Sequence, residues 1–212
     1  MDSLEFIQQF KKELLLNLPG ERAHIKMAPA HRQTLNNALK SNIEIRESAV
    51  AVVLYRDGNQ IECLLTQRPE YDGKHSGQVS FPGGKRDLLD LDLDETARRE
   101  CWEEVGIPIE TGILLGKLTE VFIPVSQFLV KPYIYFHEVL PELIADEREV
   151  AEILNFPLFD LKKEELISTM EIHLPDGTIY KDIPYFDLAN KKVWGATALI
   201  LSEIREIILG LD

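Results

Sequence analysis

Three glutamates lie close together near the middle of this sequence, and they constrain the fold more than any other feature. Glu100, Glu103 and Glu104 stand at positions i, i+3 and i+4, so on a helix their side chains project from one face within about one turn. Like charges in this arrangement repel, and a stable helix tolerates them only beside a counter-charge. The alternative is an ordinary solvated helix face. Hard divalent cations are bound by carboxylate oxygens together with substrate phosphates, so we expect this helix to border a metal-dependent site.

Local signals fix the two ends of that helix. Asp92 is followed three positions later by Glu95, which resembles a capping box at a helix start. Gly106 follows the last residue of the helical pattern and is typical of a helix end. The sequence therefore predicts a helix over about 94–105.

A glycine-rich loop precedes the helix. Residues 81–85 read Phe-Pro-Gly-Gly-Lys, and two glycines let a backbone approach a ligand closely. Lys85 is an adjacent positive charge suited to phosphate, and Arg99 is placed to tether one of the carboxylates. We therefore expect the loop and the acidic helix to bind an anionic substrate together.

The overall charge limits the partners of this chain. Its 212 residues carry 36 acidic and 23 basic side chains, a formal charge of −13 that repels polyanions at long range. We therefore expect no nucleic-acid and no membrane partner, and no stretch approaches the roughly 18 apolar residues of a membrane helix.

The N-terminus fits neither a signal nor a transit peptide, which predicts a cytoplasmic protein. Cys63 and Cys101 lie in apolar patterns and are expected to be reduced core thiols.

Strand and helix patterns alternate along the chain. The expected elements are a helix over 3–16, a hairpin of strands 49–55 and 61–67 around Asp57-Gly58, a short strand within 77–81, strands over 113–123 and 128–139, a hairpin at 175–177 and a helix over 196–209. This order predicts one mixed sheet with helices on both faces, an α/β/α sandwich. We expect an N-terminal helical lead-in over 1–44 and the main domain over 45–212.

The glycine loop and the acidic helix together resemble the Nudix box. That pattern is a Gly, five residues, a Glu, seven residues, and then Arg-Glu-apolar-x-Glu-Glu-x-Gly-apolar. Residues 99–107, Arg-Glu-Cys-Trp-Glu-Glu-Val-Gly-Ile, fit its second half at every position. The first half differs, because the stretch from Gly84 to Arg99 is one residue longer and an acidic run replaces the single Glu. Asp90 lies nearest the place of that Glu.

A narrower resemblance covers the segment just before this box. Residues 64–84, LLTQRPEYDGKHSGQVSFPGG, are similar without a gap to the signature of coenzyme A pyrophosphatases within the Nudix superfamily, LLTxRSxxLRxHxGQVxFPGG. The box that follows that signature has the same lengthened spacing. Pro69 replaces the Ser of the signature, and Asp72-Gly73 replaces its central Leu-Arg pair. Lys74 is the nearest basic substitute for the missing Arg.

The resemblance implies roles for individual residues. The implied metal ligands are Glu100, Glu103, Glu104 and the carbonyl of Gly83. Arg99 would orient Glu100, which is either a ligand or the general base. Glu149 is the other candidate for the base, because residues 149–152, ahead of an apolar strand, resemble the segment that brings an additional Nudix carboxylate to the site. The candidates for substrate contact are Arg68, Lys74, His75, Gln78 and Lys85.

The implied reaction is hydrolysis of the pyrophosphate bond of coenzyme A or its acyl derivatives to 4′-phosphopantetheine and adenosine 3′,5′-bisphosphate. Because the chain is so acidic, Mg²⁺ or Mn²⁺ would have to stand between its glutamates and the phosphates. Two alternatives stay open: a Nudix hydrolase of another nucleoside diphosphate derivative, such as a sugar nucleotide or dinucleoside polyphosphate, and a nucleotide-sensing module without turnover. The intact Arg-Glu-x-x-Glu-Glu favours an enzyme. The oligomeric state stays open as well.

Overall fold

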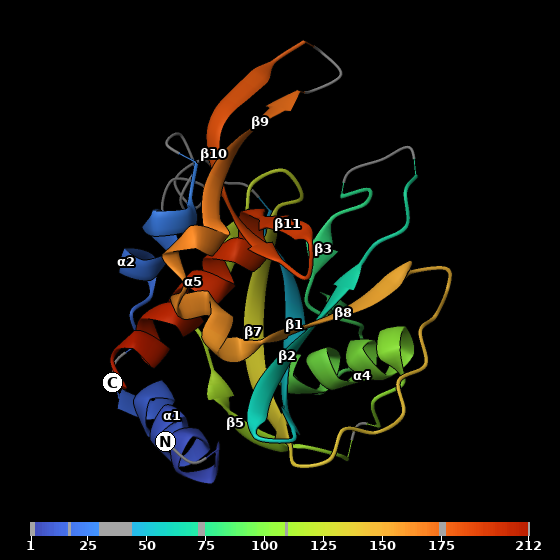
Figure 1. Cartoon of the computed structure of the whole chain (residues 1–212). Coiled ribbons are helices and arrows are strands. Elements are labelled where there is room, and N and C mark those ends of the chain that lie inside the picture. Colours follow the sequence, from blue (N-terminus) through green and yellow to red (C-terminus); the bar gives the residue numbers. More distant parts are fainter. Residues whose placement is uncertain are drawn as a thin grey trace.

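The strands form one large mixed sheet with helices on both sides, as Figure 1 shows. The structure is a computed structural model, and it describes residues 3–16, 18–29, 44–71, 75–108, 110–173 and 177–211. Within this described part the main sheet has eight strands, and β1 (Arg46–Asp57) is parallel to β7 and antiparallel to β2 and β4. The other strands are β2 (Gln60–Gln67), β3 (Val79–Ser80), β4 (Gly83–Lys85), β5 (Ile113–Lys117), β6 (Val121–Ile123), β7 (Phe128–His137) and β8 (Glu152–Pro157).

Alternating side chains of β1 enter two hydrophobic cores, one on each face of the sheet. Ala49, Ala51 and Val53 belong to the core under α4 (Leu93–Val105). Val52 and Leu54 belong to the larger core under α5 (Gly195–Leu209). Each face of the sheet is thus covered by a helix, and the predicted α/β/α sandwich is confirmed.

Several local predictions are confirmed as well. β1 and β2 form the expected hairpin, with Asp57 paired to Gln60 and Gly58 in the left-handed region at φ 57°. Cys63 and Cys101 are both free and buried. In the part of the chain that the structure describes, no helix is long and apolar enough to cross a membrane.

Two features of the sheets differ from the predictions. The strand expected over 113–123 is divided into β5 and β6, because the backbone N–H of Thr119 donates to Glu203 instead of to a neighbouring strand.

The second difference is an additional sheet beside the single sheet that the sequence predicts. Among the described residues this second sheet has three strands, β9 (Ile167–His173), β10 (Ile179–Leu188) and β11 (Lys191–Trp194), and it follows the short helices η2 (Leu158–Lys162) and η3 (Glu164–Leu166). β9 and β10 are antiparallel, and residues 175–176 of the turn predicted between them lie outside the described residues.

The N-terminal lead-in packs on the larger core. α1 (Ser3–Leu16) forms where a helix over 3–16 is predicted, and it buries Phe6, Phe10 and Leu14. The short helices α2 (Glu21–His24) and η1 (Ile25–Met27) follow and contact α5. The lead-in therefore shares a core with the main sheet, while the boundary at 44/45 stays a prediction.

A buried carboxylate joins α5 to this lead-in. Glu203 is fully buried and accepts hydrogen bonds from the N–H of Gly20 at 3.0 Å and from the N–H and hydroxyl of Thr119 at 3.1 and 2.7 Å. A ring nitrogen of His24 lies 3.1 Å from the same carboxylate. Burial raises the pKa of Glu203, but these hydrogen bonds outweigh burial and hold that pKa below its usual range.

We expect Glu203→Gln to lower the free energy of unfolding by about 1–3 kcal/mol, because the amide places a donor against groups that are themselves donors. Since the pKa of Glu203 is lowered in the folded chain, the wild-type advantage should be complete above the usual value of 4.5 and should be lost as the pH falls through the lower folded value. Urea unfolding measures both effects. The control is Glu206→Gln. Glu206 lies on α5, as Glu203 does, but it forms an ion pair with Lys26 at the surface, so this change should cost less than about 1 kcal/mol. Equal losses in the two variants would contradict this account.

Candidate active site

The ends of α4, the helix that carries the acidic cluster, are fixed by local contacts. At its start Asp92 Oδ1 accepts the N–H of Glu95 at 3.0 Å, as the capping box predicts, and Glu95 Oε2 accepts the N–H of Leu91 at 2.6 Å. At its end Gly106 adopts the left-handed conformation at φ 76°. The side chains that α4 directs into the core beneath it are Ala97, Cys101 and Val105. Glu100 and Glu104 are thereby held along the side of the helix that faces β4, and Glu103 is exposed beside them.

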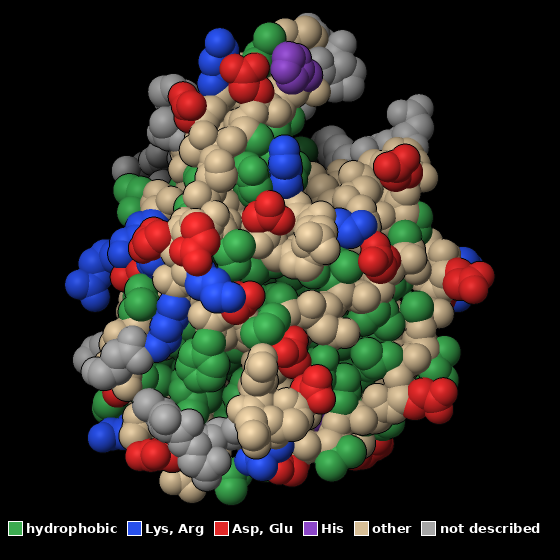
Figure 2. Space-filling view, in the orientation of Figure 1, with side chains coloured by type: hydrophobic (Ala, Val, Ile, Leu, Met, Phe, Trp, Pro, Cys, Tyr) green, Lys and Arg blue, Asp and Glu red, His purple; other side chains and the backbone are tan. Residues whose placement is uncertain are grey.

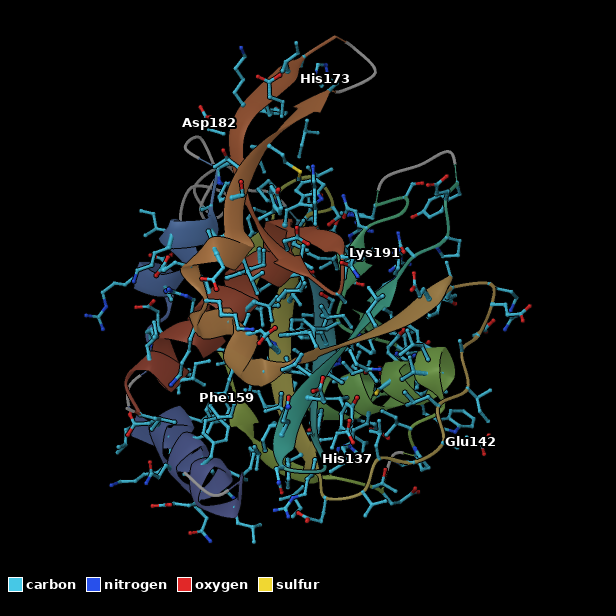
Figure 3. The ribbon with its side chains drawn as sticks, viewed as in Figure 1. His137, Glu142, Phe159, His173, Asp182 and Lys191 are labelled. Atoms are coloured by element: carbon cyan, nitrogen blue, oxygen red, sulfur yellow. The ribbon has the colours of Figure 1, made fainter. Side chains whose placement is uncertain are left out.

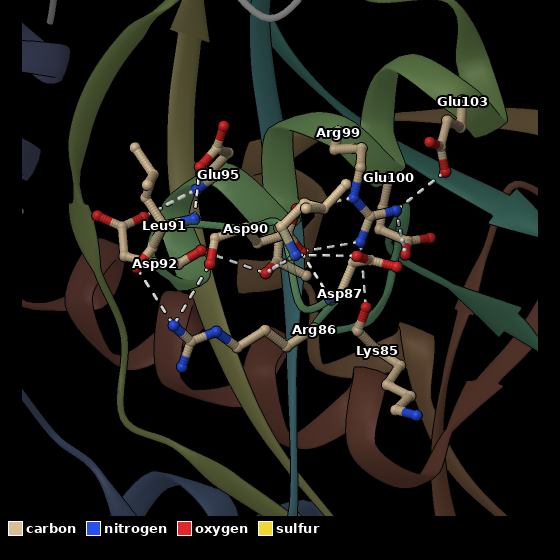
Figure 4. Close-up of polar contacts among 12 residues, drawn as sticks. Lys85, Arg86, Asp87, Asp90, Leu91, Asp92, Glu95, Arg99, Glu100 and Glu103 are labelled. Carbon is tan, nitrogen blue, oxygen red and sulfur yellow. Dashed lines mark hydrogen bonds and ion pairs between the residues drawn. The ribbon is translucent and has the colours of Figure 1, made fainter.

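The guanidinium group of Arg99 connects the acidic residues of this face, as Figure 4 shows. It binds Asp90 through two hydrogen bonds, Nε to Oδ1 at 2.9 Å and Nη2 to Oδ2 at 3.0 Å. Its Nη1 donates to Glu100 Oε1 at 2.8 Å and to Glu103 Oε2 at 3.0 Å. Its Nη2 also donates to the carbonyl of Lys85 at 3.1 Å. The structure thus places Arg99 against Glu100, and against Glu103 as well.

Asp90 is a buried anchor to which the sequence interpretation gave no role. It is 6% exposed, and it also accepts hydrogen bonds from the N–H of Asp87 and the hydroxyl of Thr96, both at 2.8 Å. The hydrogen bond from Arg99, against the opposing effect of burial, lowers the pKa of Asp90 to about 2. A two-point contact of this kind fixes the direction of a guanidinium group as well as its position. The available signal was that Asp90 lies nearest the Glu of the Nudix pattern.

The two glycines of the loop make room for other parts of the protein. A Cβ atom on Gly83 would lie 2.4 Å from the carbonyl oxygen of Ala49 in β1. A Cβ atom on Gly84 would lie 2.4 Å from Oε2 of Glu100. The sequence interpretation assigned the close approach of this loop to a ligand. In the structure the glycines allow β4 to pair with β1 and allow Glu100 to lie against the main chain.

Glu104 is the buried member of the three glutamates, with only 4% of its surface exposed. Burial is the main cause that raises its pKa to about 8, and the charges of Glu100 and Glu149 raise it further. The charge of Arg68 and a hydrogen bond from the backbone of Gly83 act in the opposite direction. Glu104 therefore keeps a proton near neutral pH, even beside Arg68, unless a further positive charge comes close to it.

A turn beyond α4 brings Glu149 to the same cluster. The N–H of Asp146 donates to the carbonyl of Glu104 at 3.0 Å, which fixes the segment before the turn at 147–149 to the end of the helix. Glu149 is exposed, and its charge raises the pKa of both Glu100 and Glu104. The structure thus brings together the glutamates of α4 and the additional carboxylate expected from the sequence.

Three candidates for substrate contact lie together, and one of them, Arg68, lies near Glu104. The N–H of Arg68 donates to the carbonyl of Gln78 at 3.0 Å, and the His75 ring lies 2.9 Å from the side-chain oxygen of Gln78. Arg68 also lowers the pKa of Glu104, so its positive charge lies near that carboxylate. Its Nε atom is buried and has no hydrogen-bond partner within the described ranges. Such a group is available to an anionic ligand.

The two lysines among the candidates have different positions. Lys85 contributes its carbonyl oxygen to Arg99, whereas its amino group points away from that guanidinium in Figure 4. Lys74 lies outside the described residues. Arg68 is therefore the candidate cation that the structure brings closest to the buried part of the cluster.

The chemistry of the cluster fits a hard divalent cation. It offers carboxylate oxygens from α4 and from the turn at 147–149, and burial raises the pKa of Glu100 and Glu104. Among the described residues, no three His, Cys, Asp or Glu side chains already converge as a formed metal site. Two of the candidate ligands, Glu100 and Glu103, instead form ion pairs with Arg99. These carboxylates would have to turn from Arg99 to act as ligands.

Comparison with known proteins decides the family. A model of the NUDIX domain matches residues 45–176. This chain belongs to the Nudix family. One relative is described as the uncharacterized Nudix hydrolase NudL of Yersinia enterocolitica, with 34% identity over 146 residues, which cover 68% of this chain and 72% of that protein. A protein of the same description from Yersinia pestis is 32% identical over 143 residues, which cover 68% and 70% of the two chains.

Solved structures share the fold at lower sequence identity. A binary complex of a C. elegans Ap4A hydrolase has a TM-score of 0.53 and 17% identity, and it covers 79% of this chain and 100% of its own. A MutT/nudix family protein from Enterococcus faecalis has a TM-score of 0.52 and 15% identity, and it covers 99% of this chain and 75% of its own. The predicted fold is therefore confirmed. Family membership also confirms the predicted enzyme class, a Nudix pyrophosphohydrolase that uses a divalent cation.

We expect the metal-free protein to lose stability as the pH rises from about 4.5 to 8, because folded Glu104 keeps its proton up to a pKa of about 8 and the unfolded chain loses it near 4.5. One such proton changes the free energy of unfolding by at most about 1.4 kcal/mol per pH unit. Glu104→Gln should flatten this part of the profile, whereas exposed Glu103→Gln should leave it unchanged. Urea unfolding in EDTA at several pH values measures the slope. The same slope in wild type and Glu104→Gln would show that Glu104 is not protonated in the fold.

Proposed function

We propose that this protein hydrolyses the pyrophosphate bond of coenzyme A or its acyl derivatives, which gives 4′-phosphopantetheine and adenosine 3′,5′-bisphosphate. The observation that carries the proposal is the gap-free likeness of residues 64–84 to the coenzyme A pyrophosphatase signature. Near the start of this segment Arg68 influences Glu104 through its charge, and near its end Gly83 forms a hydrogen bond with the same carboxylate. The segment that resembles a substrate signature therefore meets the acidic cluster at Glu104.

The proposed ligands of Mg²⁺ or Mn²⁺ are Glu100, Glu103, Glu104 and the carbonyl of Gly83. A bound cation of this kind neutralises phosphate charge and stabilises the leaving group. Arg99 holds Glu100 and Glu103 on one side of α4, which limits the directions in which the two carboxylates can turn. Glu104 must lose its proton to act as a ligand, because only the carboxylate form binds a metal.

Glu149 is the proposed general base. It is exposed on a turn, where it can take a proton from water while the water oxygen bonds to phosphorus and the bridging P–O bond breaks. Glu100 is the alternative base, but one of its oxygens accepts a hydrogen bond from Arg99 and the other faces Gly84. The exposed carboxylate therefore has the greater freedom to reach a water molecule. Arg68, with His75 and Gln78 beside it, would bind the phosphates of the substrate.

The partner in this proposal is a small nucleotide-derived molecule in the cytoplasm. On the face drawn in Figure 2, carboxylates are interspersed with Lys and Arg side chains, and this face shows no continuous basic surface of the kind that binds nucleic acid. The free thiols of Cys63 and Cys101 suit a reducing compartment.

A substrate panel tests the proposal directly. The purified protein is incubated with Mg²⁺ or Mn²⁺ and with coenzyme A, an acyl-coenzyme A, a sugar nucleotide and a dinucleoside polyphosphate, and the products are identified by mass. We expect 4′-phosphopantetheine or its acyl form, together with adenosine 3′,5′-bisphosphate. A clear preference for another compound would assign the protein to a different Nudix substrate, and binding without turnover would make it a sensing module.

Two matched variants separate the base from the metal ligands. Glu149→Gln should lower kcat by about 100-fold or more with little change in the affinity for the cation, because it removes a proton acceptor. Glu103→Gln should weaken the binding of the cation, because it removes an anionic oxygen. Metal titration of activity at saturating substrate measures both quantities. An inert Glu149→Gln would return the role of base to Glu100, and equal metal defects would place Glu149 among the ligands.

The 3′-phosphate of coenzyme A provides a test of substrate recognition. If Arg68 or Lys74 binds this phosphate, dephospho-coenzyme A should have a kcat/KM lower by about ten- to a hundredfold, the effect of one charge-assisted hydrogen bond. Replacing the responsible residue by Gln should shrink this difference, mainly by slowing the reaction of coenzyme A. Equal efficiency on both compounds would remove coenzyme A as the preferred substrate and leave the metal-dependent reaction intact.

A further inference from the structure

Gln67, the last residue of β2, joins two segments that carry candidate site residues. Its side-chain Nε2 donates to the carbonyl of Gly77 at 3.3 Å, which holds the residues next to Gln78. Its backbone carbonyl accepts the N–H of Ala151 at 2.8 Å, which holds the segment that follows Glu149. One residue therefore connects the proposed substrate contacts to the proposed base.

Lys191, from the second sheet, determines how this glutamine lies. Its Nζ donates to Gln67 Oε1 at 2.8 Å and forms an ion pair with Glu152 Oε2 at 2.8 Å. Figure 3 shows Lys191 where the β10–β11 turn meets the end of β2. Because the ammonium group can only donate, it selects Oε1 of the amide and leaves the donor Nε2 directed at Gly77. The lysine thus sets the orientation on which the contact between Gln67 and Gly77 depends.

The conformation of the turn before Lys191 restricts the position of this residue. Leu188 pairs with Lys191 across a two-residue turn, in which Ala189 and Asn190 are both left-handed at φ 50° and 60°. Alanine rarely adopts this conformation, and such strain persists only where the surrounding structure demands it, often beside functional sites. The next residue, Lys192, instead extends over the ring of Tyr185 at 5.2 Å.

We propose that Lys191 is a positioning residue of the active site. Through Gln67 and Glu152 it fixes Gly77 and the described residues beside it, 75–78, relative to the turn that carries Glu149, and it touches no reacting atom itself. The second sheet thereby contributes to catalysis through a single ammonium group. The catalytic part of this inference rests on the proposed function, whereas the coupling between the two segments does not.

Hydrogen exchange without substrate tests the coupling. Lys191→Met removes the ammonium group and keeps most of the stem, so exchange should accelerate about tenfold or more at the amides around 75–78 and 149–152. Exchange in α4 and in β1 should stay as in the wild type. Lys191→Arg keeps the charge and the donors and should restore protection, and Lys192→Met is the matched control that should change neither segment.

Kinetics on the compound that the panel identifies test the catalytic part. A merely structural loss reduces the folded fraction, which lowers the apparent kcat and leaves KM unchanged. Displaced substrate contacts should instead raise KM by about threefold or more in Lys191→Met, together with a fall in kcat. Lys191→Arg should recover most of both values.

Each result then decides one part of the inference. Faster exchange throughout the chain, unchanged exchange in either segment, or the same effect in Lys192→Met would overturn the coupling. Local exchange as expected with unchanged kinetics would overturn the catalytic part and retain the coupling. If the panel yields no substrate, the proposed function fails, and the exchange result still decides whether Lys191 couples the two segments.

Discussion

The ion pair between Arg99 and Asp90 is the interaction on which the rest of the acidic face depends. Moving charges out of water costs several kcal/mol per ion, so such a pair persists only where the remaining hydrogen-bonding groups are also satisfied. Asp90 meets this condition, because it accepts two bonds from Arg99 and one each from the N–H of Asp87 and the hydroxyl of Thr96. The guanidinium group so anchored has its remaining donors directed at Glu100, Glu103 and the carbonyl of Lys85. The loop before α4 and two of the carboxylates on α4, Glu100 and Glu103, are therefore ordered by one side chain.

The three glutamates avoid mutual repulsion by three different means, which explains how one turn of helix can carry all of them. Glu103 is about half exposed and is screened by water. Glu100 lies against Arg99, and Gly84 leaves the space for it beside the main chain. Glu104 is buried with a pKa of about 8 and avoids the repulsion by staying neutral. A bound cation would complete this arrangement, because its positive charge would oppose the effect of burial and lower the pKa of Glu104.

Elements fixed by neighbouring residues were predictable from the sequence, and elements fixed by distant residues were not. The limits of α4 follow from Asp92, Glu95 and Gly106, which all act within one turn of the helix ends. The division of 113–123 depends on Glu203, which lies 84 residues beyond Thr119 in the chain. The contact between Gln67 and Lys191 spans 124 residues; Gln67 stands at a variable position of the 64–84 signature, and Lys191 lies outside both motifs. The Nudix pattern located the glutamates and placed Asp90 nearest the position of its first Glu, but the anchoring role of Asp90 required the structure, because it depends on contacts with Arg99, Asp87 and Thr96 that the pattern does not contain.

The same distinction bears on how one fold serves different substrates. The acidic helix is held by short-range contacts and by an anchor within its own motif, so its chemistry is kept wherever that motif is kept. Residues 75–78 are held through Gln67, whose own long-range contacts to Ala151 and Lys191 lie outside the motif. If Lys191 acts as proposed, changes in the second sheet would move the proposed substrate contacts without disturbing the glutamates of α4. Specificity that resides in such a segment can diverge while the hydrolytic machinery stays constant, which is why family membership determines the reaction here more firmly than it determines the substrate.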